Sequence, residues 1–280
     1  MKRVLYRWTM WGSFLLWGAL FSCELQAQSL VRVGGTGAGM VLLNRLLEDY
    51  RRVQPAVAIK LMMPPMGSTG SLRALAGGML ELAVVSFPPG QQVPGVATWT
   101  SKVLPWVTTP LVFTGRDLAA GAQMTLEQVA DIYAGRVTRW PDGRLVRLIT
   151  RTELETDTKL LRAASPVLDS AIIVALQRLG PPVAVNDIEN QQMLERTPGS
   201  FGSVALGQIR LTQSPLRPLT LDRIDPTPAT LQTGAYKLSK ALYLVIPKEA
   251  KSEVLDFVKY LQSPALLKEL ESYGFVGLSR

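Results

Sequence analysis

Apolar residues recur along the chain with two different spacings, and the two spacings alternate. A short continuous or alternating apolar run predicts a strand, whereas apolar residues three or four positions apart predict one face of a helix. Strand-like runs and helix-like segments follow one another through most of the sequence after residue 28, without an internal repeat. This alternation is typical of an α/β protein.

The first third of the chain predicts two helices between three strands. Met40, Leu43, Leu47 and Tyr50 fall on one face of the first helix, and a Gly-Ser-Thr-Gly-Ser loop opens the second helix. The three strand-like runs are 30–33, 57–63 and 82–86.

The remaining two thirds continue the alternation. A segment at 104–114, interrupted by Pro105 and Pro110, is expected to be extended and to cross between lobes. Thr125 and Gln128 predict a capping box at a helix start, and Thr156 or Asp157 is expected to cap a later helix. Further helices are predicted at 166–179, 190–196 and from Pro264, and strands at 144–150, 203–206 and 241–246.

The N-terminus has the layout of an export signal. Three basic residues precede an uncharged apolar run from Trp8 to Phe21. This run is shorter than the roughly 20 residues that a membrane span needs. Two endings stay open: cleavage after Ala27 would release the chain, whereas Cys23, in a segment resembling a bacterial lipobox, would carry a lipid anchor. We therefore expect residues 1–27 to be a signal peptide and the protein to be periplasmic.

Composition excludes several classes of site. The sequence has no histidine and one cysteine, which rules out Ser-His-Asp and Cys-His catalysis, histidine zinc sites, thiolate clusters and intramolecular disulfides. We expect no metal and no other cofactor. Cleavage after Ala27 would lower the formal net charge from +8 to +6, because residues 1–27 contain three basic residues and one acidic residue. This mild positive excess suits attraction of small anions, whereas the lack of basic runs argues against nucleic acid.

Three loops share a character suited to oxyanions. Each carries small hydroxyl residues between a strand and a helix, with glycines in the first two loops, and backbone N–H groups and the helix dipole favour negative charge there. They are 36–39, 68–71 and 156–158, the last preceded by Arg151 at a strand end. One such loop is explained equally well as a helix cap. Three in one chain, with an arginine that can bind an oxyanion bidentately, favour an anion site.

Other candidate chemistry has simpler explanations. Glu153 and Glu155 are too isolated for acid–base catalysis, so one is expected to orient Arg151 and the other to be solvated. Trp99, Trp106 and Trp140 are expected to be packing residues rather than a stacking platform for a ligand.

Four segments, in this order, resemble the periplasmic phosphate-binding proteins of ABC transporters, within the PBP-like superfamily. They are GSTGSLRALAGGMLELAVVS, MTLEQVADIYAGRVTRWPDG, TPGSFGSVAL and FVKYLQSPALLKELESYGFVGL. The resemblance implies a type II-like periplasmic-binding-protein fold, with a ligand cleft between two α/β lobes. The first lobe would comprise 28–105 and 235–280, and the second 106–234.

The resemblance also implies a set of ligand-binding residues from the three loops and the third strand. They are Thr36, Gly37, Ser68, Thr69, Gly70, Ser86, Arg151, Thr156, Asp157 and Thr158. The chain departs from the family pattern where Phe87 stands in place of the aspartate that accepts the proton of hydrogen phosphate. Asp157 replaces a glycine and is our candidate for that role, and Glu153 replaces the aspartate that orients the arginine.

The expected function is therefore capture of phosphate and delivery to an ABC permease by a monomeric, non-enzymatic binding protein. Because the strand-end aspartate is missing, specificity for a related oxyanion such as sulfate or molybdate, or a sensory role, stays open. The alternative from another class is an exported phosphoester hydrolase with a serine nucleophile such as Ser68. No base stands at a recognisable spacing from that serine.

Overall fold

A computed structural model describes residues 29–87 and 101–278. The predicted signal peptide at 1–27, Cys23 and Trp99 lie outside the described residues. No described helix is both long and apolar enough to cross a membrane.

Strands and helices alternate as the apolar spacing predicts. The chain begins with β1 (Ser29–Gly35), α1 (Gly37–Val53), β2 (Val57–Leu61), α2 (Gly67–Ala76), β3 (Leu82–Val85) and the long strand β4 (Ser101–Thr114). The middle contains β5 (Gln123–Met124), α3 (Leu126–Ala134), β6 (Arg147–Leu148), β7 (Thr150–Arg151), α4 (Thr156–Ala164), α5 (Pro166–Gln177), β8 (Val183–Ala184), α6 (Asp187–Arg196), β9 (Ser200–Ala205), α7 (Leu206–Leu211), β10 (Thr220–Leu221) and α8 (Pro228–Gln232). It ends with β11 (Ser239–Pro247), α9 (Ser252–Leu261), α10 (Pro264–Ser272) and β12 (Val276–Gly277).

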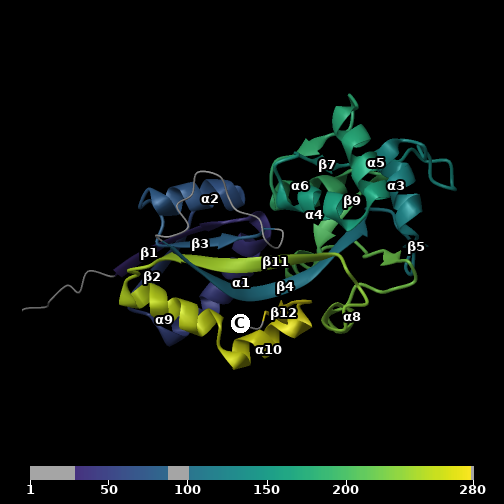
Figure 1. Cartoon of the computed structure of the whole chain (residues 1–280). Helices are drawn as coiled ribbons and strands as arrows, with labels where there is room; N and C mark the ends of the chain where they lie inside the picture. The colour runs from purple at the N-terminus through teal and green to yellow at the C-terminus, as the bar shows by residue number, and fades with distance from the viewer. Residues whose placement is uncertain (1–28, 88–100, 279–280) are drawn as a thin grey trace, which may run out of the picture.

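A mixed sheet in the order β2-β1-β3-β11-β4-β9-β6 runs through the molecule, with β12 paired to β4. β1 pairs in parallel with β2 and β3, whereas β11 runs antiparallel between β3 and β4. Figure 1 shows β4 and β11 extending together from one group of helices toward the other. The α/β fold class predicted from the sequence is confirmed.

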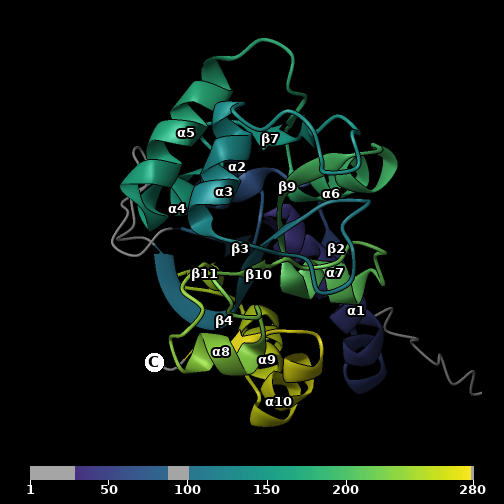
Figure 2. The same cartoon turned by 90° about the vertical axis from the view of Figure 1, so that its right-hand side faces the viewer.

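Four apolar clusters pack within the described residues, and the two largest lie in different lobes. In lobe 1, the face of α1 that carries Leu43, Leu47 and Tyr50 packs with Trp106 and with Phe257 of α9. In lobe 2, Leu111 and Phe113 pack with helices α3 and α5 and with Phe201. Figure 2 shows α3, α4 and α5 gathered at one end of the molecule and α8, α9 and α10 at the other.

Local capping rules account for some helix starts and fail at one. Thr125 Oγ1 accepts a hydrogen bond from the Gln128 amide at 3.3 Å, and the Gln128 side chain accepts one from the Thr125 amide, which confirms the capping box. The predicted cap of α4 is wrong. Glu155 occupies the cap position and makes no side-chain cap bond. Thr156 and Asp157 instead lie within the first turn of the helix and contact Ser86 and Lys240.

Two sequence predictions differ from the structure in extent. The predicted strand at 144–150 is broken into the short pairs that β6 makes with β9 and β7 makes with β8. Helix α6 begins at Asp187, three residues earlier than the 190–196 prediction, because Asn186 caps it by accepting the Glu189 amide at 2.9 Å. This earlier start places Asp187 in the first turn of the helix.

Candidate ligand-binding cleft

Helix starts from both lobes surround one cavity of about 540 Å³. Lobe 1 contributes Thr36 and the 66–70 segment, and lobe 2 contributes Glu155, Thr156 and Asp187. These residues follow β1, β2, β7 and β8 in the chain. In open α/β sheets, the carboxyl ends of the strands are where ligands bind.

The predicted hydroxyl residues lie at this cavity, and most of them already make hydrogen bonds. Thr36 Oγ1 accepts from the Gly39 amide at 3.2 Å, which leaves its hydroxyl hydrogen free for a ligand. Ser68 Oγ donates to the Ser86 carbonyl at 2.8 Å and accepts from the Ser86 amide at 2.9 Å. Thr156 Oγ1 donates to the same carbonyl at 2.8 Å. Ser86 therefore joins hydroxyl side chains from the two lobes.

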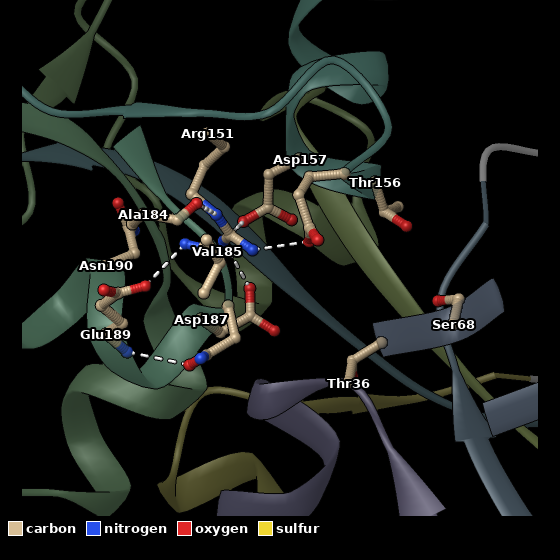
Figure 3. A network of polar contacts seen from close by, with 12 residues as sticks. Thr36, Ser68, Arg151, Thr156, Asp157, Ala184, Val185, Asp187, Glu189 and Asn190 are labelled. Carbon is tan, nitrogen blue, oxygen red and sulfur yellow. Dashed lines mark hydrogen bonds and ion pairs between the residues drawn. The ribbon is translucent and has the colours of Figure 1, made fainter. Parts of the chain in front are cut away.

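Arg151 is only 5% exposed and is surrounded by carboxylates. Its Nη1 lies 2.8 Å from Asp187 Oδ1, and its Nη2 lies 2.6 Å from Glu155 Oε2. Asp157 Oδ2 is 3.5 Å from the same Nη1. Figure 3 shows the guanidinium between Asp157 and Asp187. The strand-end arginine is thus buried and contacts three carboxylates.

A second buried cation, Lys240 at the start of β11, completes this cluster. Its side chain is 2% exposed, and its Nζ lies 2.6 Å from Asp157 Oδ1 and 2.7 Å from Asp187 Oδ1. We call Arg151, Lys240, Glu155, Asp157 and Asp187 the cleft network. It contains two cations and three carboxylates, and it links β11 to the starts of α4 and α6.

Asp187 makes the most varied contacts in the cleft network. Besides the two cations on Oδ1, its Oδ2 accepts a hydrogen bond from the Ala38 amide, in the first turn of α1, at 3.0 Å. Gly37 permits this approach, because a Cβ there would lie 2.7 Å from the Asp187 Cβ. A carboxylate of lobe 2 is therefore held against the N-terminus of a lobe 1 helix.

Burial and ion pairing act in opposite directions on the charges of the cleft network. Burial alone would raise the pKa of Asp187, but Lys240 and Arg151 outweigh it and hold the pKa well below its usual value. For Lys240, burial favours the neutral form, yet Asp157 and Asp187 keep the pKa raised. Glu155 differs, because burial is its largest influence and its pKa is raised despite Arg151.

The low pKa of Asp187 predicts acid sensitivity. The unfolded chain takes up a proton at this residue near the usual value of about 3.9, whereas the folded form resists protonation. The stabilisation is therefore present above about pH 4 and is lost as the pH falls further. We expect denaturant melts from pH 7 to pH 3 to show a steeper loss of unfolding free energy below pH 4 in wild type than in Asp187→Asn. Parallel curves would contradict this assignment.

Several predicted site residues lie away from the cavity lining. Arg151 and Thr158 instead border a small pocket beside Tyr133, and Asp157 faces Lys240. Ser86 is fully buried, and its Oγ has no hydrogen-bond partner among the described residues. A role of these residues in ligand binding stays a prediction.

The expected partner of Arg151 requires a correction. Glu153 does not replace the aspartate that orients the arginine, because its side chain is 70% exposed and pairs with Arg162 at 3.0 Å. Glu155 takes that place. It lies four residues after Arg151, at the cap position of α4, and the turn between them brings the carboxylate back to the guanidinium.

Sequence reasoning missed Asp187 and Lys240. Asn186 followed by Glu189 is a helix-start pattern, with a cap residue and an acidic residue at the third helical position, and it would have placed Asp187 at the helix start. Nothing local marks Lys240, because a lysine before the apolar run of β11 looks like an ordinary surface residue.

The two described tryptophans pack within the lobes, as expected. Trp106 is 1% exposed and donates its Nε1 hydrogen to the Leu261 carbonyl at 2.8 Å. Trp140 contacts the ring of Phe201 and donates to the Gly199 carbonyl at 3.0 Å. Neither lines the cavity.

Comparison with known proteins gives a family match over most of the chain. A family model described as a PBP superfamily domain matches residues 24–265. No curated protein matches the sequence closely enough to count as a relative.

Solved structures with the same fold include proteins described as phosphate receptors. A phosphate ABC transporter substrate-binding protein of Clostridium perfringens, with bound phosphate, has a TM-score of 0.73 at 14% identity, covering 90% of this chain and 100% of that one. An ABC-type phosphate transport receptor of Vibrio cholerae has a TM-score of 0.62 at 16% identity, with coverage of 89% and 100%. PstS of Borrelia burgdorferi has a TM-score of 0.51 at 18% identity, with coverage of 90% and 100%. At these identities the likeness establishes the fold.

Proposed function

Since the chain belongs to the PBP superfamily, we propose that it is a solute-binding protein that captures a small oxyanion between its lobes and delivers it to an ABC permease. Phosphate is the first candidate. The protein performs no covalent chemistry on the solute in this proposal, and it works as a monomer. The likeness to structures described as phosphate receptors supports the choice of solute class.

The observation that carries the proposal is the chemistry of the cavity lining. Hydroxyl side chains come from both lobes, namely Thr36, Ser68, Thr69 and Thr156. Arg73 and Lys159 also line the cavity, and neither makes an ion pair with another residue in the part of the chain that the structure describes. Unpaired cations beside hydroxyl donors and helix starts favour an anionic, oxygen-rich solute.

We also propose where the chain passes between lobes. Trp106 and Val107 pack in the core of lobe 1, whereas Leu111 packs in lobe 2. On the return, Leu238 packs in lobe 2 and Leu242 in lobe 1. These contacts support crossings within 108–110 and 239–241, a few residues beyond the sequence-based bounds at 105/106 and 234/235.

Delivery to a permease requires export, so the proposed location is the periplasm. Residues 1–27 would be removed if cleavage follows Ala27. Processing at Cys23 would instead leave a lipidated chain, and the intact mass of the exported protein distinguishes the two.

Calorimetric titration of the exported protein with phosphate, sulfate and molybdate tests this function. We expect one phosphate to bind per chain. At a phosphate concentration of 100 times the dissociation constant, the free energy of unfolding should rise by roughly 2.7 kcal/mol. Lys159→Ala should weaken binding and reduce its salt dependence, because it removes an unpaired cation from the lining. Arg139→Ala, an exposed change outside the cavity lining, is the control. Absence of binding to all three anions would contradict the proposal, and sustained turnover of a phosphate ester would favour the hydrolase.

A further inference from the structure

The groups around the Asp187 carboxylate are those that hold an oxyanion in proteins. They are a backbone N–H in the first turn of a helix, a guanidinium and an ammonium, at 3.0, 2.8 and 2.7 Å. Helix N-termini and buried arginines bind free phosphate and carboxylate by the same hydrogen bonds. These three groups form an anion-binding arrangement beside the cavity, which Lys240 and Asp187 line. The Asp187 carboxylate occupies this arrangement.

We propose that Asp187 is an internal competitor of the solute, a specificity-determining residue whose carboxylate occupies the anion position formed by Ala38, Arg151 and Lys240. This inference rests on the proposed function, because it takes the solute to be an oxyanion that the same amide and two cations can bind. An oxyanion reaches both buried cations only when the Asp187 carboxylate leaves them.

The other two carboxylates of the cleft network do not fit this role. Asp157 contacts Lys240 and Arg151, but it does not line the cavity and receives no hydrogen bond from α1. Glu155 lines the cavity but pairs with Arg151 alone. Only Asp187 lines the cavity, contacts both cations and accepts an amide hydrogen from the facing lobe.

Competition of this kind lowers affinity and changes selectivity. If the side chain fills the site in nine of ten molecules, the apparent affinity for a solute falls about tenfold, because only the open fraction binds. Asp157 and Glu155 remain beside the site when Asp187 moves, so a fully ionised dianion meets more like charge than a protonated oxyanion does. An anion that the two cations bind only weakly therefore does not displace the Asp187 carboxylate.

Removing the competitor tests the inference. In Asp187→Ala, the amide and both cations lose their anion, so we expect affinity for phosphate to rise at least about tenfold above wild type. Formate, which replaces the deleted carboxylate, should raise the melting temperature of this variant and leave that of wild type unchanged. Glu81→Ala is the matched control, because Glu81 also pairs with an arginine, Arg32 at 2.6 Å, but lies outside the cavity lining. It should show no rescue by formate.

Each outcome separates this inference from the proposed function. Tighter binding of phosphate to Asp187→Ala than to wild type supports the competitor even if wild type binds no phosphate, which would contradict only the proposed function. Equal or weaker binding, with no stabilisation by formate, would overturn the competitor even if wild type binds phosphate well. Should the alanine variant fail to fold, Asp187→Asn should still bind phosphate more tightly than wild type, because a neutral amide holds the two cations less strongly than a carboxylate does.

Discussion

Lys240→Met is expected to lower the free energy of unfolding by about 3–5 kcal/mol, the usual cost of leaving a buried charge without its partner. Lys240 is almost completely buried, and it is the nearest cation to Asp157 and one of two cations on Asp187. Methionine fills similar space but cannot neutralise either carboxylate. Denaturant melts at neutral pH measure the loss.

Two further variants show whether the loss comes from the charge. Lys237→Met, three residues earlier and exposed, should leave the unfolding free energy within about 0.5 kcal/mol of wild type. Adding Asp157→Leu to Lys240→Met should recover a large part of the lost stability, because it removes the buried carboxylate whose nearest cation is Lys240 and whose other cation, Arg151, lies 3.5 Å away. A double variant that is less stable than Lys240→Met would contradict the ion-pair explanation.

Arg151→Ala is expected to weaken phosphate binding by about 2–5 kcal/mol, or about 30-fold to 4,000-fold in dissociation constant. The solute that displaces Asp187 is expected to accept the hydrogen bond from Arg151. The same change leaves Glu155 without a cation and Asp187 with Lys240 alone, so the variant should also be less stable. Calorimetry on the folded fraction, at fixed pH and salt, gives the affinity.

Arg147→Ala provides the comparison for this prediction. Arg147 is an exposed arginine of β6, four residues earlier, and its removal changes the net charge equally. Its phosphate affinity should match that of wild type. If Arg151→Ala also binds phosphate with wild-type affinity, the solute stays in the outer part of the cavity and Arg151 only stabilises the lobe.

The sequence predicts the elements well because their signals are local. The apolar face of α1 and the Thr125–Gln128 capping box depend on residues within a few positions of each other. The hydroxyl-rich helix starts at Thr36, which caps α1, and at Ser68, in the first turn of α2, are local in the same way, and both lie at the cavity.

The interior of the site depends on contacts between distant segments, and the sequence does not reveal these. Asp187 meets Ala38 across 149 positions and Lys240 across 53. Arg151 looked like a free anion-binding arginine because its neighbours in sequence give no sign of Asp187. One of its carboxylate partners, Asp187, belongs to α6, which begins three residues earlier than the sequence predicts.

The crystal structure of Asp187→Ala grown with phosphate is the most direct test of the claim that the cleft network contains an anion site. We expect phosphate oxygens within hydrogen-bonding distance, about 2.7–3.2 Å, of the Ala38 amide, the Arg151 guanidinium and Lys240 Nζ. A structure in which phosphate is absent there, while Arg151 and Lys240 pair with Glu155 and Asp157 alone, would contradict the claim.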